Sequence, residues 1–159
     1  MYNRENAVNY AHRWASSRNP RYYDFENIGG DCTNFASQVI YAGCGKMNYT
    51  PTFGWYYNSL NDRSPSWTGV NQLYNFLISN QGVGPRAVLS TLSEVEAGDI
   101  IQLDFNALTP EFDHSPVVVD AGAGTPDTIL VAAHTNDSDY RPLSTYNYEK
   151  FRVLKIFCD

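Results

Sequence analysis

Apolar residues recur every three or four positions in three segments of the chain, which predicts three amphipathic helices. The first is expected from Asn3 to Ser17, before the break at Pro20. The second is expected to begin at Asp31 and to run to about Tyr41, because Gly43 can supply its C-terminal stop. The third is expected from Val70 to about Asn80. The apolar positions that define these helices are Ala7, Tyr10, Ala11, Trp14 and Ala15, then Cys32, Phe35, Ala36, Val39 and Ile40, and then Val70, Leu73, Tyr74, Leu77 and Ile78.

After residue 85 the pattern changes to short runs with β-strand character. The expected strands are Ile100 to Phe105, Pro116 to Asp120, Thr128 to His134 and Phe151 to Phe157. Residues 44–69 show no clear period and are rich in Gly, Pro, Ser and Asn, which predicts a long ordered loop. Helices followed by an antiparallel sheet indicate an α+β fold, and we expect one domain over residues 1–159.

Composition and charge exclude several classes of function. The chain has 159 residues, of which 18% are charged, a formal net charge of −6, a pI near 4.9 and no basic cluster. Such a chain has little to neutralise phosphates or anionic lipids, so we expect neither nucleic acid nor a membrane as a partner. No stretch approaches the roughly 20 apolar residues that cross a bilayer. Residues 1–9 lack the apolar core of a signal peptide, which predicts a leaderless protein or a domain cut from a longer secreted one.

Three cysteines leave at least one free thiol, because an odd number cannot be fully paired. Cys32 follows two glycines and Asp31, and it lies in the first turn of the second predicted helix. The glycines let the backbone approach a ligand closely, and Asp31 can cap the helix. A helix N-terminus stabilises a thiolate, whereas the Asp31 carboxylate opposes this effect, so the cysteine needs a histidine. The alternative is a buried structural thiol. Cys44 and Cys158 lack such a setting and are interpreted as structural thiols or a disulfide pair.

Two histidines stand at the ends of neighbouring predicted strands. His114 precedes the run 116–120, and His134 closes the run 128–134, with a turn-rich segment between them. If the hairpin is centred on Gly124, His114 lies directly opposite His134, although a slip of one residue would undo this alignment.

A thiol nucleophile requires a base that a second polar group orients. We therefore predict His114 as the base and His134 as the group that orients it. Asn136 and Asp137 are alternatives for the orienting group, because the turn after the strand could bring either side chain back.

The sequence around these residues resembles the bacterial putative amidase domain family. The matching strings are residues 30–38 (GDCTNFASQ), 55–58 (WYYN), 66–67 (SW), 98–102 (GDIIQ), 114–115 (HS) and 134–137 (HTND). That family is similar to the CHAP and NlpC-type branch of papain-like cysteine hydrolases, whose members commonly cleave peptidoglycan. The resemblance runs from about Asn19 to Leu143. It implies a papain-like α+β fold with the nucleophile at a helix N-terminus, and it places the nucleophile at Cys32, the strand-start histidine at His114 and the third polar group at His134.

The expected function is therefore cysteine-dependent hydrolysis of amide bonds, with bacterial cell-wall peptide as the substrate. We expect no metal or organic cofactor, a monomeric protein, and a location outside the cell or in the cell wall. The backbone N–H of Cys32 is expected to hold part of the oxyanion, with Tyr22 and Tyr23 as candidate side-chain donors. Asp113, directly before the histidine, is expected to raise the pKa of His114.

Three other functions remain compatible with the sequence. A zinc hydrolase could use Cys32, His114 and His134 as ligands. A non-catalytic module could bind glycan or peptide through aromatic residues of the Trp55 to Trp67 segment. A cysteine peptidase directed at proteins would use the same nucleophile and base as the cell-wall enzyme.

Overall fold

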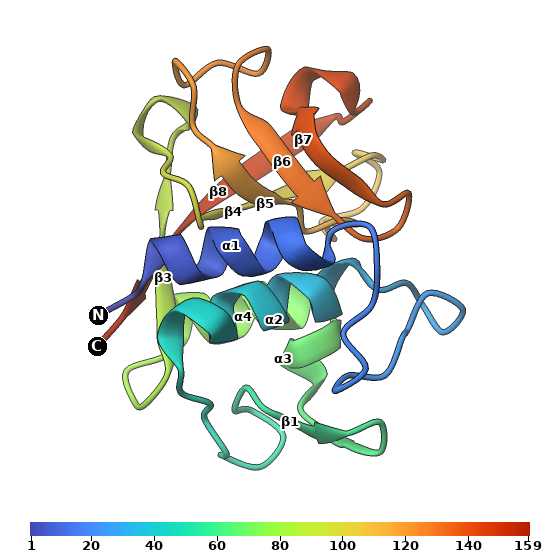
Figure 1. The fold of residues 1–159 in the computed structure, drawn as a ribbon, viewed down its shortest axis with the longest axis vertical. Coiled ribbons are helices and arrows are strands. Elements are labelled where there is room, and N and C mark those ends of the chain that lie inside the picture. The colour runs from blue at the N-terminus through green and yellow to red at the C-terminus, as the bar shows by residue number, and fades with distance from the viewer.

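The structure is a computed structural model that describes residues 1–159, and it combines helices with an antiparallel sheet (Figure 1). The helices are α1 (Arg4–Trp14), α2 (Cys32–Cys44), α3 (Pro65–Thr68) and α4 (Val70–Ser79). All three predicted helices are present, and the predicted α+β class is confirmed. None of the helices is long and apolar enough to span a bilayer.

Six strands form the main sheet, and every neighbouring pair is antiparallel. They are β3 (Pro85–Ser90), β4 (Ile100–Asp104), β5 (Val117–Asp120), β6 (Leu130–Ala133), β7 (Ser138–Pro142) and β8 (Lys150–Cys158), in the spatial order β3-β8-β4-β5-β6-β7. A separate small sheet joins β1 (Tyr57–Ser59) and β2 (Asp62–Arg63). Single 3₁₀ turns, η1 (Leu92–Glu94) and η2 (Leu143–Thr145), precede β4 and follow β7. The four predicted strands correspond to β4, β5, β6 and β8.

The sheet is covered on both faces, which explains why β5, apart from its last residue, and β6 are apolar without alternation. On one side, α1 packs between the sheet and α2, against β5 and β6, while α4 packs against β3 (Figure 1). This side holds a core of 23 buried residues. A second core of eight buried residues lies on the other face, under the loops that connect the strands. Every residue of β4 is buried as a result.

Helix α2 ends later than the sequence suggested, and the reason lies in how it packs. Gly45 ends it, with φ at 72° and its N–H donating to the carbonyl of Tyr41. Gly43 is inside the helix, where a Cβ atom would collide with the ring of Tyr2. The carbonyl of Gly43 also accepts from the N–H of Asn3 at 2.8 Å. The absence of a side chain at Gly43 therefore allows the N-terminal residues to pack closely against α2. The prediction that Gly43 stops the helix was wrong.

The sequence pattern missed the two edge strands and the elements inside the long loop. Strand β7 has no buried residue, so it carries no alternation of apolar and polar positions. Strand β3 follows directly after Gly84 and is largely open on its outer side. Residues 44–69, predicted as an ordered loop, are ordered but also contain β1, β2 and α3.

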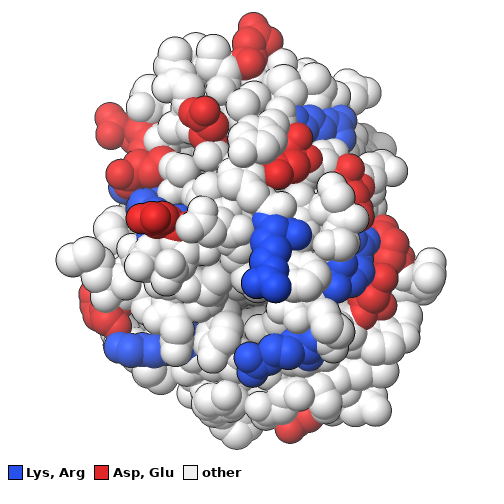
Figure 2. All heavy atoms as spheres, viewed as in Figure 1, with Lys and Arg blue, Asp and Glu red and all other residues white.

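Charged side chains are distributed without a large patch of one sign on the face that Figure 2 shows, where Lys and Arg stand among Asp and Glu. The net charge of −6 thus reflects a mixed surface on this face and not one acidic region. The expectation that the chain lacks a strongly basic binding surface rests on its composition, and this face agrees with it.

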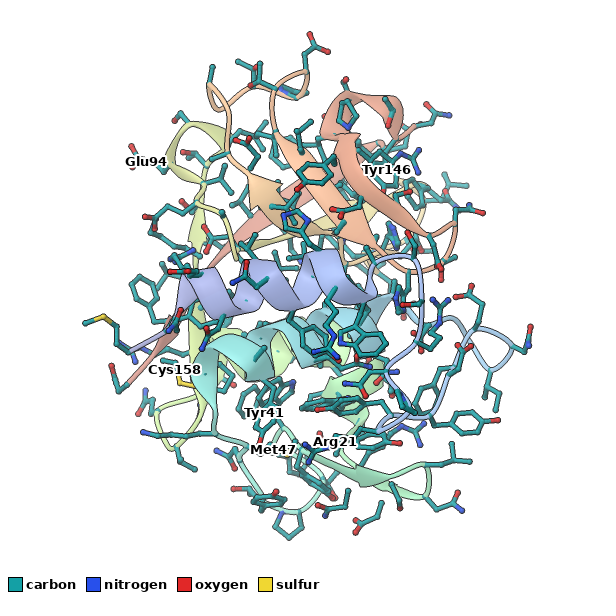
Figure 3. All side chains as sticks on the ribbon, viewed as in Figure 1. Arg21, Tyr41, Met47, Glu94, Tyr146 and Cys158 are labelled. Carbon is teal, nitrogen blue, oxygen red and sulfur yellow. A yellow bond between two sulfur atoms is a disulfide. The ribbon has the colours of Figure 1, made fainter.

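One disulfide joins Cys44 and Cys158, which ties the end of α2 to the end of β8 (Figure 3). The two Cα atoms are 5.6 Å apart, and 114 residues separate the cysteines in the sequence. A bridge across so long a loop restricts the unfolded chain strongly. The third cysteine, Cys32, is free and buried.

Reducing this disulfide is expected to lower the free energy of unfolding by about 3 kcal/mol, because the unfolded chain regains the freedom of a long loop. Urea unfolding with and without reductant measures the change. The double variant Cys44→Ser/Cys158→Ser is the control, and it should show the lower stability in both conditions. Equal unfolding midpoints for the oxidised and reduced protein would contradict the expectation.

Candidate active site

Cys32 is the first residue of α2 and opens onto a small cavity. The side chain is buried, with 8% of the residue exposed. The cavity has a volume of about 280 Å³, and His114, Asn136, Arg141 and Tyr146 contribute to its wall with Cys32. A larger hollow of about 410 Å³ lies beside α4, but no charged side chain, histidine or cysteine lines it. The smaller cavity is the one that a free thiol and a histidine line together.

Two glycines shape the entrance to α2. Gly29 and Gly30 have φ values of 85° and 98°, a conformation that residues with a Cβ atom rarely adopt. Both line the cavity, and a Cβ atom on Gly30 would already touch the hydroxyl of Thr135 at 3.4 Å. The chain can thus turn sharply before Cys32 while leaving room in front of the sulfur.

Asp31 precedes the helix but does not cap it. Its side chain makes no hydrogen bond to the N–H groups of α2. Instead, Oδ1 accepts from the N–H of Phe25 and from Nδ2 of Asn34, both at 2.8 Å, and Oδ2 faces Nδ1 of His134 at 2.5 Å. Arg18 lies 3.6 Å away. The prediction of a cap was wrong. The prediction that this carboxylate opposes a thiolate is confirmed in direction, because its negative charge is one of the smaller causes that raise the pKa of Cys32.

His134 is enclosed beneath the cavity and does not line it. Its two ring nitrogens face Asp31 and the carbonyl of Trp14, the latter at 2.8 Å, and its ring stacks on Phe35 with centroids 4.1 Å apart. The partner at each nitrogen is an oxygen, a carboxylate oxygen of Asp31 on one side and a backbone carbonyl oxygen on the other, so both ring nitrogens are engaged. His134 thereby joins the end of α1, the start of α2 and the end of β6.

The hairpin register separates the two histidines that the sequence analysis placed opposite each other. Val117 pairs with Ala132 and Val118 with Val131, one residue away from the predicted alignment, and a bulge follows. His114 pairs with Leu103 of β4 instead. The prediction that His114 lies opposite His134 was wrong, because a one-residue slip sends alternate side chains to opposite faces.

His114 is buried, and its surroundings favour the neutral ring. Only 5% of the residue is exposed. Burial, with the positive charge of Arg141 as a smaller cause, lowers the pKa of His114 to about 4. The expectation that Asp113 raises this pKa was wrong, since that carboxylate accepts from the N–H of Phe105 at 2.8 Å and is directed at the loop.

Burial also raises the pKa of the Cys32 thiol, although hydrogen bonds from Thr33 and from the backbone of Ser115 partly oppose the rise. At neutral pH the site therefore holds a thiol and a neutral imidazole, not a preformed ion pair. His114 can accept the thiol proton as a general base when a substrate is present.

Alkylation of Cys32 by iodoacetamide is accordingly expected to be slow at pH 7 and to rise about tenfold per pH unit until above pH 8.5, the ordinary thiol value. The capacity of His114 to accept a proton should be lost only as the pH falls through about 4, where the ring becomes protonated. Mass spectrometry measures the rate of Cys32 alkylation at each pH. The urea-unfolded protein is the control, because its cysteine has an ordinary pKa. An alkylation rate that is high and constant between about pH 5 and pH 8, as expected for a thiolate–imidazolium pair, would contradict a neutral thiol at this site.

Asn136 is the predicted orienting residue that lies at the cavity. It follows Thr135, and the two have φ values of 59° and 64°, so the chain turns back toward Cys32 directly after β6. Asp137 forms an ion pair with Arg18 at 2.8 Å and does not line the cavity. The structure shows no hydrogen bond between a side chain and the ring of His114, and the amide of Asn136 is not bonded elsewhere.

Two cavity residues had no signal in the sequence. Arg141 and Tyr146 come from β7 and the end of η2, a polar segment in which no strand was predicted. The two tyrosines proposed as oxyanion donors, Tyr22 and Tyr23, lie instead in a separate hollow beside β1. The prediction of these tyrosines as donors was wrong, because residues that precede a cysteine in the sequence need not lie near it in the structure.

The alternative sites predicted from the sequence are not assembled in the structure. Cys32, His114 and His134 do not form a group that could hold a metal ion. Trp55 and Trp67 are fully buried, with ring centroids 4.6 Å apart, so they belong to the core and not to a binding surface.

Comparison with known proteins identifies the family of the chain. A family model described as "Putative amidase domain" matches residues 1–157. The uncharacterized protein YhbB of Bacillus subtilis (strain 168) is 36% identical over 144 residues, which are 89% of this chain and 44% of YhbB. The uncharacterized protein YjcM of the same organism is 27% identical over 100 residues, which are 63% of this chain and 22% of YjcM. The chain thus spans less than half the length of either relative. No solved structure matches it.

Proposed function

Because the chain belongs to the family described as a putative amidase domain, we propose that it is a cysteine-dependent amide hydrolase with Cys32 as nucleophile and His114 as acid and base. One observation carries the proposal. The free cysteine of the chain begins a buried helix and shares a small cavity with a buried histidine that pairs with β4 of the sheet. A thiol and an imidazole at one cavity are the minimum for acyl transfer to sulfur.

The first half of the reaction forms a thioester. His114 takes the proton of the Cys32 thiol while the sulfur attacks the amide carbon, and the π electrons of the carbonyl move to its oxygen. When this intermediate collapses, the carbonyl re-forms, the carbon–nitrogen bond breaks, and the leaving amine takes the proton from His114.

The second half consumes water. His114 accepts a proton from water as the oxygen attacks the thioester, and the sulfur leaves as a thiolate that regains this proton. The product is a carboxylic acid. Asn136 is proposed to orient the ring of His114 during both halves, because its free amide is at the cavity. His134, which was predicted for this task, is proposed to position α2 through Asp31.

The proposed substrate is the peptide part of the bacterial cell wall, and the proposed location is the cell wall or the medium outside. The similarity of the family to papain-like cell-wall hydrolases supports the substrate. The disulfide between Cys44 and Cys158 supports the location, because such bridges persist in oxidising compartments. We propose that the chain acts as a monomer and that its fold is papain-like, with the nucleophile at a helix N-terminus beside an antiparallel sheet that carries the base.

Digestion of purified peptidoglycan tests the substrate. The protein is expected to release fragments with new amino termini, which mass spectrometry assigns to the sugar–peptide amide, the stem peptide or the cross-bridge. Prior alkylation of Cys32 should stop the release, whereas a chelator should not change it. Release that survives alkylation would contradict the proposed nucleophile. Absence of fragments together with cleavage of denatured protein would move the substrate to polypeptides in general.

A further inference from the structure

The phenol of Tyr146 is a buried polar group that nothing in the protein satisfies. Three buried side-chain atoms lack a hydrogen-bond partner, namely the Tyr146 hydroxyl, Nε of Arg18 and Oδ2 of Asp104. The latter two belong to charged groups with opposite charges nearby, at 3.2 Å from Asp24 and 3.5 Å from Lys150. The Tyr146 hydroxyl is the uncharged member of the three, and the guanidinium of Arg141 lies near it without making a hydrogen bond to it. Buried hydroxyls are normally hydrogen-bonded, so this one is exceptional.

The ring of Tyr146 is held firmly, which fixes the direction of its hydroxyl. The guanidinium of Arg141 lies 3.6 Å above the ring centroid, and its Nε donates to Thr145 at 2.7 Å. The ring of Phe105 packs at 6.5 Å on centroids. The guanidinium lies over the ring, and none of its N–H groups makes a hydrogen bond of normal geometry to the hydroxyl. The side chain is thus positioned in advance, at the end of the sheet beside β7 (Figure 3).

Tyr146 faces the reacting groups. Its ring centroid is 5.5 Å from that of His114, and it lines the same cavity as Cys32. Burial raises the pKa of Tyr146 further above neutrality, although the neighbouring Arg141 guanidinium partly opposes the rise, so the phenol keeps its proton. A neutral phenol at this place can donate one hydrogen bond into the cavity.

The backbone N–H of Cys32 is a second donor without a partner in the protein. It begins α2, where the first N–H groups of a helix have no acceptor within the helix, and it makes no other hydrogen bond. Acyl transfer places negative charge on the carbonyl oxygen of the substrate, and two fixed donors in a cavity shielded from water stabilise such a charge strongly.

We propose that Tyr146 is a catalytic residue whose hydroxyl donates, together with the backbone N–H of Cys32, to the oxyanion that forms when Cys32 attacks the amide. This inference rests on the proposed function. It explains why an unsatisfied hydroxyl is kept in a buried position, since the cost in stability is accepted at sites where the group acts on a substrate.

The test is the variant Tyr146→Phe. We expect kcat for release of amino termini from peptidoglycan to fall roughly 10²- to 10³-fold with little change in KM, as for removal of other oxyanion donors. The unfolding midpoint should stay the same or rise, because the variant removes an unsatisfied polar group and leaves the ring in place. The rate of Cys32 alkylation should also stay the same. Tyr148→Phe, a half-buried tyrosine of the same segment that does not line the cavity, is the control and should keep full activity.

A second measurement is independent of the natural substrate. A small peptide aldehyde adds the Cys32 sulfur to its carbonyl carbon, and the carbonyl oxygen takes the proton and occupies the oxyanion position. Tyr146→Phe should weaken this binding about tenfold or more, since one neutral hydrogen bond is lost. Full activity and unchanged aldehyde affinity in Tyr146→Phe, with Cys32→Ala inactive, would overturn the role of Tyr146 and leave the proposed function intact. Loss of stability in proportion to loss of activity would show a structural role. Activity in Cys32→Ala would overturn both.

Discussion

Replacement of Cys32 by alanine is expected to abolish amide hydrolysis while the protein stays folded. The proposed reaction passes through a bond to this sulfur, and no other free thiol exists in the chain. Removal of a nucleophile costs at least about 10⁴-fold in kcat in enzymes of this kind of chemistry. Release of new amino termini from peptidoglycan measures the loss. The variant Cys32→Ser keeps a polar side chain of similar size. We expect the same loss in kcat, because the serine hydroxyl is a weaker nucleophile than the thiol.

Stability measurements separate loss of chemistry from loss of structure in these variants. Cys32 is at the helix end and its sulfur borders the cavity, so alanine should leave the urea midpoint nearly unchanged. The matched control is Cys44→Ser/Cys158→Ser, which keeps only Cys32 and should retain activity below its lowered melting temperature. Turnover by Cys32→Ala that exceeds a small fraction of the original rate would exclude the proposed mechanism. Loss of activity in the control alone would point to the disulfide instead.

The helices and central strands could be predicted from the sequence because both have their own periodic or continuous apolar pattern. The positions of Trp14 and Val39 follow from a helical period, and residues 117–119 and 130–133 are apolar runs because the sheet is covered on both faces. Edge strands give no such signal. Residues of β7 are polar since neither side is fully covered, and the ladder is held by backbone hydrogen bonds that any sequence can make.

Only those parts of the candidate site that depend on local sequence features could be predicted. The places of Cys32 at a helix start and His114 before a strand are local properties, and the structure brings both to one cavity. The relation of His114 to His134 depended on the register, and the pairing of Val117 with Ala132 is one residue away from the predicted one. Tyr146 could not be found, because its position results from the packing of η2 over the sheet and not from a spacing in the sequence.

Replacement of Asp31 by alanine is expected to lower the free energy of unfolding by about 3 to 5 kcal/mol, the usual cost of removing one partner of a buried ion pair. Asp31 and His134 have side chains that are each 1% exposed, at 2.5 Å from each other. Without the carboxylate, Nδ1 of His134 has no partner in direct contact, and the N–H of Phe25 and the amide of Asn34 lose their acceptor. Because these contacts fix the loop before α2, activity should fall as well. Urea unfolding followed by circular dichroism measures the stability.

A second histidine–aspartate pair of the same chain supplies the control. His12 and Asp139 are 2.9 Å apart, but their side chains are 27% and 20% exposed, so water screens the charges and replaces the lost contact. Asp139→Ala is therefore expected to cost about 1 kcal/mol or less. Asp31→Asn should fall between the two, because an amide can donate to a neutral His134 that still donates to the Trp14 carbonyl. Equal costs for Asp31→Ala and Asp139→Ala would mean that the buried pair does not hold the start of α2 and that the backbone turn at the two glycines positions Cys32 by itself.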